Sequence, residues 1–302
     1  RENYGPDHTT NVERPMIHLS TVTRSFLLVS AVFMSIFLIP VCVLSGEEIS
    51  GELRQWHCVT ITFDGPECSE DGQPNPFMDY RLDVTFRKGN RSFTVPGYYA
   101  ADGNAAETGA ERGNKWRVHF VPDEVGTWSY TASFRQGEGV AVHTDPNSGS
   151  QALFNGTEGM FEVEPTDKTG RDHRGKGMLQ YVGKRYLRFA GTGEYYLKGG
   201  ADSPENFLAY AEFDGTYFCG ETEEGRSGEA DPSANLHRYE PHRNDWRVGD
   251  PVWRNGKGQG IIGALNYLSE KGMNSVYFLT MNVEGDGNDV WPWTSHTERY
   301  RF

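Results

Sequence analysis

Between residues 55 and 164, apolar and polar residues alternate in short runs, and most runs end in a turn motif with glycine or proline. In residues 79–86, the side chains of Tyr80, Leu82, Val84 and Phe86 share one face, as in a half-buried antiparallel strand. Further runs occupy residues 59–63, 92–95, 115–121, 127–134 and 161–164. Strands of this length without a helical period predict an all-β immunoglobulin-like or fibronectin-like sandwich over residues 52–165.

The aromatic residues of this region have two interpretations. Trp116 and Trp128 stand among the alternating apolar positions of their strands, which predicts that both are buried in the core. Tyr98 and Tyr99 are adjacent, so one ring must face outward. The outward ring is the better candidate for stacking on a sugar.

The charge balance excludes one class of partner. The 302 residues include 42 acidic and 29 basic side chains, which gives a formal net charge of −13. A phosphate backbone requires a basic face, so we expect no nucleic-acid partner. The sequence indicates no cofactor, and a neutral or cationic partner fits the charge better.

The segment from Met16 to residue 45 resembles an export leader, and the residues before Met16 are upstream sequence. An uncharged apolar run spans residues 26–44, and small residues precede a possible cleavage point before Gly46. The run is nearly long enough to span a bilayer, so an uncleaved membrane anchor is the alternative. Both interpretations predict that the rest of the chain is secreted, periplasmic or at the cell surface.

Cleavage would leave three cysteines, Cys58, Cys68 and Cys219. In an oxidising compartment, Cys58 and Cys68 could close a short loop through a disulfide. Three free thiols are the other possibility, because the spacing does not show that the two Cβ atoms meet.

A charged, glycine-rich stretch at residues 166–177 indicates a linker to a second region, residues 178–302. We predict strands there at residues 179–182, 185–189 and 195–198, and a helix at residues 261–271 that ends at Gly272. A continuous apolar run at residues 275–281 predicts a strand buried on both faces. Strand, helix and strand form a βαβ unit, which is typical of a parallel sheet.

Polar residues follow the two outer strands of this unit, and parallel strands end at the same edge of a sheet. We therefore predict a substrate-binding site that also includes two tryptophans flanking a proline: Asp202, Glu205, Asn206, Asn282, Asp286, Trp291 and Trp293. The alternative is structural, with Asp202 capping a turn, Glu205 in solvent and the tryptophans in packing. Residues 286–289 resemble a calcium turn only weakly, and no metal site is predicted.

Several longer motifs resemble one family. They include NPFMDYRLDVTF, NKWRVHFVPDEVGTWSYTASF, TDKTGRDHRGKG and LQYVGKRYLRFAGTGEYYLKGGADSPENFLAY. They resemble exported bacterial proteins in which a domain of unknown function 5060 precedes a glycoside-hydrolase-like βα barrel. The resemblance covers roughly residues 59–293 and implies a secreted, glycan-active protein with an accessory sandwich. It also implies that Tyr195 and Ser275 open the first two strands of an α/β barrel of the TIM type.

The chain departs from this family near its end. Relatives continue past the position equivalent to Phe302. A complete βα barrel takes about 250 residues, which is more than residues 178–302 provide. No residue matches the two catalytic carboxylates by motif, so we assign no catalytic residue and expect an incomplete barrel without activity. The first hypothesis is the N-terminal part of a secreted glycosidase-like enzyme. The second is a non-catalytic exported sandwich that binds carbohydrate or another surface component.

Overall fold

The computed structural model describes residues 46–201, 207–213 and 236–278. The predicted leader and the sequence before it, residues 1–45, lie outside these residues, as does Cys219. Within the described ranges, no helix has the length and apolar character needed to cross a membrane.

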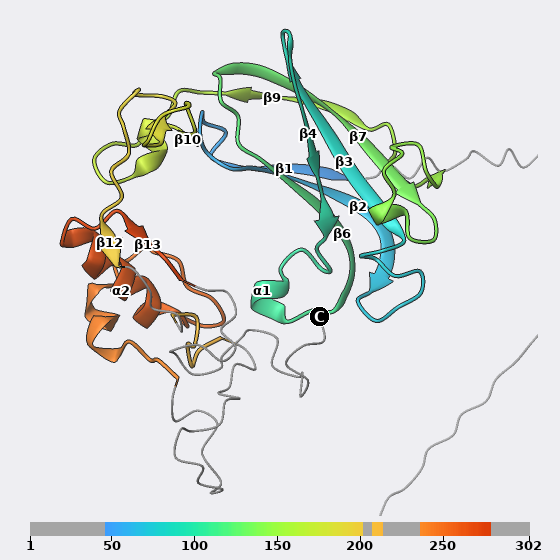
Figure 1. Ribbon diagram of the computed structural model, residues 1–302. Helices are drawn as coiled ribbons and strands as arrows, with labels where there is room; N and C mark the ends of the chain where they lie inside the picture. The colour runs from blue at the N-terminus through green and yellow to red at the C-terminus, as the bar shows by residue number, and fades with distance from the viewer. Residues whose placement is uncertain (1–45, 202–206, 214–235, 279–302) are drawn as a thin grey trace, which may run out of the picture. The chain divides into compact units, whose positions relative to one another are not determined.

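A two-sheet sandwich forms the first part of the described chain, with its sheets face to face (Figure 1). The first sheet has the order β1 (Glu47–Gly51), β2 (Val59–Ser69), β6 (Arg112–Phe120), β5 (Tyr98–Tyr99). The second has the order β4 (Arg91–Pro96), β3 (Tyr80–Lys88), β7 (Gly126–Gln136), β8 (Ser150–Gln151), and β9 (Glu158–Val163) also pairs with β7. A helical turn, α1 (Ala105–Thr108), and a 3-10 turn, η1 (Val140–Val142), lie in the loops. The predicted β-sandwich is therefore confirmed.

The core of the sandwich consists of the apolar faces that the alternation predicts. On β3 and β7, the inward side chains are Tyr80, Leu82, Val84, Phe86, Trp128, Tyr130, Ala132 and Phe134, all buried. The two tryptophans are core residues, with Trp116 1% and Trp128 0% exposed. Tyr99 is buried, whereas Tyr98 is 44% exposed, so Tyr98 is the outward ring of the adjacent pair.

β2 is longer than the predicted run at residues 59–63, because it continues through the turn-like motif Asp64-Gly65-Pro66 that follows this run. The strand continues to Ser69, and Cys68 pairs with Gly113 on β6 after a register shift. A Cβ at Gly65 would lie 2.4 Å from Cδ1 of Trp116. The glycine therefore makes room for the indole ring instead of ending the strand.

This continuity decides between the two possibilities for Cys58 and Cys68, because it rules out a disulfide between them. The 11-residue strand extends roughly 35 Å, with Cys58 just before its first residue and Cys68 near its end. A disulfide requires Cα atoms within about 7 Å. Both cysteines are free thiols in the structure.

We expect both thiols to react with an alkylating reagent without prior reduction. Cys58 is exposed and should be labelled first. Burial raises the pKa of the Cys68 thiol, which lowers its thiolate fraction, so Cys68 should react more slowly. Peptide mass spectrometry after timed labelling measures both rates. A peptide pair that remains linked until reductant is added would contradict this expectation.

The second part of the described chain has less regular structure. It contains η2 (His173–Lys176), β10 (Leu179–Gln180), β11 (Arg188–Phe189), β12 (Gly200–Ala201), η3 (Glu240–Asp245), α2 (Gln259–Glu270) and β13 (Ser275–Val276). β10 and β11 form an antiparallel pair within the first two predicted strands. The predicted helix is confirmed as α2, and Gly272 follows it at a φ of 85°.

α2 packs closely on η3 through its small residues. A Cβ at Gly263 would lie 1.9 Å from the carbonyl oxygen of His242, and one at Gly260 would lie 2.4 Å from that of Arg238. On the same helix Ile261 is buried. The apolar spacing that predicts the helix therefore also predicts part of its packing face.

Two predicted strands need correction. Residues 195–198 form no strand, apart from an isolated bridge between Tyr195 and Arg188. Within residues 275–278, the described part of the predicted run 275–281, the strand consists of Ser275 and Val276, and Tyr277 is 49% exposed. The prediction of a strand buried on both faces is thus wrong for its described part, because an apolar run fixes neither its strand length nor its neighbours.

Candidate functional site

β12 and β13 are parallel neighbours, with Gly200 opposite Ser275. Asn274 fixes this pairing from the residue before β13. The backbone amide of Asn274 donates to the carbonyl of Gly199 at 2.7 Å, and the side-chain oxygen of Asn274 accepts from the backbone amide of Gly199 at 2.8 Å. The carboxyl ends of the two strands therefore lie at one edge, as the βαβ interpretation requires.

The predicted site residues begin immediately beyond this edge. Asp202 follows the last residue of β12 directly, and Asn282 stands a few residues after β13. The full predicted set lies outside the described residues: Asp202, Glu205, Asn206, Asn282, Asp286, Trp291 and Trp293. What the structure supports is the parallel arrangement of the two strands that lead into them.

The ionised carboxylate of Glu212 connects several parts of the segment around α2. Glu212 accepts hydrogen bonds from the Tyr210 hydroxyl at 2.6 Å, the Gly258 amide at 2.6 Å and Arg243 at 2.9 Å. Burial alone raises the pKa of Glu212, but these hydrogen bonds and the charge of Arg243 outweigh it and lower the pKa. Both carboxylate oxygens are thus occupied, and the role of Glu212 is structural.

No sequence signal indicates this role of Glu212, because two of its three partners, Arg243 and Gly258, are distant along the chain. Gly258 is the residue that caps the start of α2, so the carboxylate also satisfies a free amide at the positive end of the helix. Around it lie Tyr210, Phe213 and Trp253, with Phe213 and Trp253 stacked at 5.4 Å.

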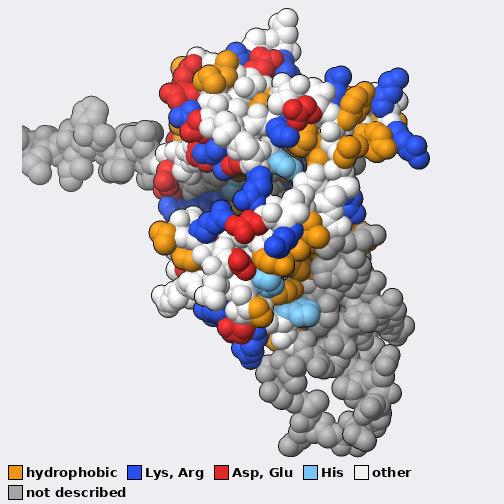
Figure 2. All heavy atoms as spheres, turned by 90° about the vertical axis from the view of Figure 1, so that its left-hand side faces the viewer, with side chains coloured by type: hydrophobic (Ala, Val, Ile, Leu, Met, Phe, Trp, Pro, Cys, Tyr) orange, Lys and Arg blue, Asp and Glu red, His pale blue; other side chains and the backbone are white. Residues whose placement is uncertain are grey.

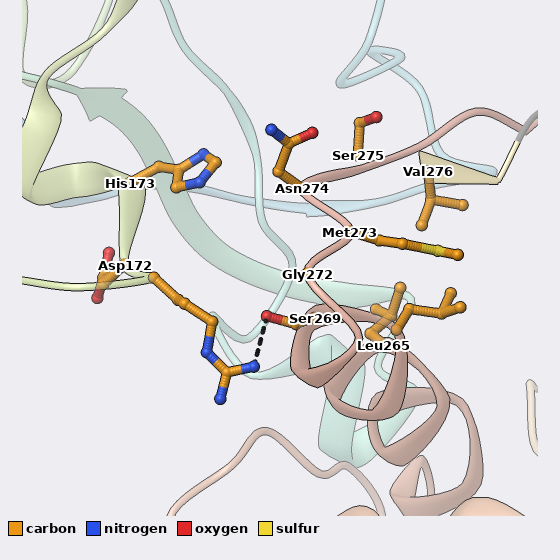
Figure 3. A pocket seen from close by; sticks show the side chains of 11 residues that line it. Asp172, His173, Leu265, Ser269, Gly272, Met273, Asn274, Ser275 and Val276 are labelled. Carbon is orange, nitrogen blue, oxygen red and sulfur yellow. Dashed lines mark hydrogen bonds between the residues drawn. The ribbon is translucent and has the colours of Figure 1, made fainter. Parts of the chain in front are cut away.

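A cavity of about 480 Å³ lies at the amino end of β13 (Figure 3). Leu265, Met273 and Val276 supply apolar wall, and Asp172 and His173 come from the opposite side. Arg171 donates to the hydroxyl of Ser269 at 3.3 Å. Ligands of parallel αβ sheets bind at the carboxyl ends of strands, so this cavity is not the predicted site.

One cluster has the composition of a metal site. Ligand atoms of Glu52, His57 and Asp167 lie within 4.8 Å of one another. However, the ammonium of Lys168 lies 2.7 Å from Glu52 and 3.1 Å from Asp167. Arg174 lies 2.9 Å from Glu52 and Arg54 lies 3.7 Å from Asp167. The basic side chains together neutralise the carboxylates that a cation would need, so we interpret the cluster as an ion-pair network. It includes the buried His57, whose Nε2 lies 2.9 Å from the hydroxyl of Thr166.

Charge on the visible surface is mixed. Figure 2 shows basic and acidic side chains interspersed on one face, without a patch of a single sign. Such a face offers no strong field to steer a highly charged ligand.

The described fold defines a protein in two parts, a β-sandwich followed by a βα segment with parallel strands. Residues 52–135 match a family described as "Domain of unknown function (DUF5060)". The match confirms the domain that the sequence motifs indicate for the sandwich.

The chain is also similar to a solved structure described as a "putative glycoside hydrolase" from Bacteroides vulgatus, at 23% identity and a TM-score of 0.34. This match covers 55% of the present chain and 27% of the other, so the chain corresponds to well under half of that protein. No curated protein matches the chain.

Proposed function

We propose that this chain is a secreted, glycoside-hydrolase-like protein that binds carbohydrate. In this proposal the sandwich is an accessory domain, and a βα barrel begins at β12. The observation that carries the proposal is the parallel pair of β12 and β13, joined through α2 and following a DUF5060 sandwich. Export rests on the uncharged apolar run at residues 26–44.

The proposed substrate site is the carboxyl edge of β12 and β13. Asp202 and Asp286 would accept hydrogen bonds from sugar hydroxyls, and Trp291 and Trp293 would stack on the ring. Glycoside hydrolysis requires one carboxylic acid to protonate the leaving oxygen and a second carboxylate as nucleophile or base. We assign neither role to these residues, so the proposal for residues 1–302 is binding of a glycan without turnover.

The test replaces Asp202 and Asp286 by asparagine, singly and together. An isosteric change in a loop should leave stability within about 0.5 kcal/mol. Loss of the charge-assisted bonds should weaken affinity for a bound oligosaccharide at least about tenfold. Calorimetric titration of the wild type and variants, with a neutral oligosaccharide identified on a glycan array, measures the effect. Unchanged affinity in the double variant would refute the strand-end site.

A non-catalytic carbohydrate-binding sandwich is the second candidate function. The observation in its favour is a small pocket with aromatic walls in the sandwich itself. The two functions are compatible, because an accessory sandwich can hold the same polymer that a barrel acts on.

A further inference from the structure

A pocket of about 220 Å³ opens in the sandwich where the chain crosses from β4 to β5. The crossing is tight, because the amide of Gly97 donates to the carbonyl of Leu82 at 2.8 Å. A Cβ at Gly97 would lie 2.4 Å from a Leu82 methyl carbon, so only glycine fits there. Tyr80 and Trp116, with ring centres 5.1 Å apart, form part of the wall.

Phe77 lies at this pocket with 51% of its surface exposed, although it is a large apolar ring. It meets the buried Tyr99 edge to face, at 6.1 Å between ring centres. The turn that carries Phe77 is held in place by hydrogen bonds. The backbone amide of Phe77 donates to the side-chain oxygen of Asn75 at 2.9 Å, and the backbone amide of Asn75 donates to the Asp79 carboxylate at 2.8 Å. The exposed ring is therefore preorganised for stacking.

The charged side chains that line the pocket are Arg81 and Asp83. The terminal nitrogens of Arg81 all donate to backbone carbonyls of one loop, namely those of Val140, His143, Asp145 and Pro146. Its Nε atom lies 3.3 Å from the Asp83 carboxylate. The guanidinium thus has no terminal donor left for an anionic ligand.

Of the two charged side chains at the pocket, Asp83 is the one that can still accept a hydrogen bond from a ligand. Its side chain is 29% exposed, and burial raises the pKa of its carboxyl group despite the nearby charge of Arg81. A partly desolvated carboxylate gains more from a hydroxyl donor than a fully solvated one does. The pocket therefore combines a hydrogen-bond acceptor with an apolar ring.

We propose that this pocket binds a single neutral pyranose unit, with the C–H face of the sugar on Phe77 and its hydroxyls on Asp83. The inference rests on the proposed carbohydrate function and gives it a second site, separate from the strand edge. The volume of the pocket is below the roughly 300–1,000 Å³ of pockets for drug-sized ligands. A pocket of this size fits one sugar ring. A uronic acid would place its carboxylate near Asp83 without a free cation to pair with, so uronic acids should be excluded.

The experiment uses saturation-transfer NMR on the full chain with a panel of neutral methyl pyranosides and the methyl glycoside of glucuronic acid. At least one neutral pyranoside should bind, and the glucuronide should not. Phe77→Ala and Asp83→Asn should each weaken the binding about tenfold. Met160→Ala is the control, because Met160 is 70% exposed on β9 and does not line the pocket. If Phe77→Ala lowers the melting temperature, Phe77→Leu takes its place in the test, because leucine keeps the apolar bulk without the aromatic face.

The outcomes separate this inference from the proposed function. Binding that survives Phe77→Ala and Asp83→Asn, but is lost in Asp202→Asn, would overturn the inference and leave the strand-end site standing. Binding lost in the two pocket variants and unchanged in Asp202→Asn supports the inference. Preference for the glucuronide would overturn it, and so would the absence of any pyranoside binding alongside retained oligosaccharide binding.

Discussion

Replacement of Trp128 by alanine is expected to remove about 3–5 kcal/mol from the stability of the sandwich. Trp128 is fully buried, its indole packs edge to face on Phe120 at 5.0 Å, and its N–H donates to the Glu124 carbonyl at 2.9 Å. The alanine variant loses this packing and leaves a cavity and an unpaired carbonyl. Because small domains are stable by only about 5–15 kcal/mol, much of the net stability would be lost.

Thermal unfolding followed by circular dichroism measures the effect, and hydrogen exchange of β3 and β7 peptides assigns it to the sandwich. Trp128→Phe is the matched control, because it keeps most of the volume but not the indole donor, and should cost less than half as much. A Trp128→Ala variant with the melting temperature and exchange of the wild type would contradict the described core.

The second large effect is expected at Glu212. Glu212→Ala removes the shared acceptor of Tyr210, Arg243 and the Gly258 amide, and should destabilise the segment around α2 by about 2–4 kcal/mol. Hydrogen exchange of α2 amides measures this locally. Glu240→Ala is the matched control, because Glu240 is 62% exposed, lies 3.9 Å from Arg243 and should contribute under about 0.5 kcal/mol. Equal exchange in both variants would contradict the structural role of Glu212.

The same carboxylate gives the segment a pH dependence with a defined sign. The folded state lowers the pKa of Glu212 below its ordinary value of 4.5. Its contribution is therefore complete above about pH 4.5, where the unfolded chain is also ionised, and is lost as the pH falls through the folded pKa. Protection of α2 amides should fall in the wild type over this acidic range, and much less in Glu212→Gln.

Local pattern was sufficient to predict most strands of the sandwich and their inward faces. Alternation along residues 79–86 depends only on neighbouring residues, and the structure buries the same side chains. It was insufficient where a distant contact decides the outcome. The Asp64-Gly65-Pro66 motif is typical of a turn, but the strand continues through it. Asp64 and Cys68 pair with β6 on the two sides of a register shift, and Gly65 makes room for the ring of Trp116.

The sequence pattern likewise indicated the strand-edge site but not the pocket in the sandwich. The βαβ pattern predicted parallel strands at residues 195–198 and 275–281. The structure has a parallel pair, but its first strand is Gly200–Ala201, just after the predicted one, and only two residues of each strand are paired. The sandwich pocket could not be predicted, because Phe77 comes from a turn, Asp83 from β3 and Tyr99 from another sheet. β1 was also missed, because its five residues contain a single large apolar side chain, Ile49.

The most direct test of the carbohydrate function is a glycan array probed with the purified 302-residue chain, followed by product analysis of every retained glycan. The account predicts retention of at least one neutral pyranose-containing glycan, without cleavage and with no affinity for nucleic acid. Retention of no glycan at all would contradict the carbohydrate function. Cleavage of a retained glycan that is lost in Glu205→Gln would contradict the assignment of Glu205 to binding alone.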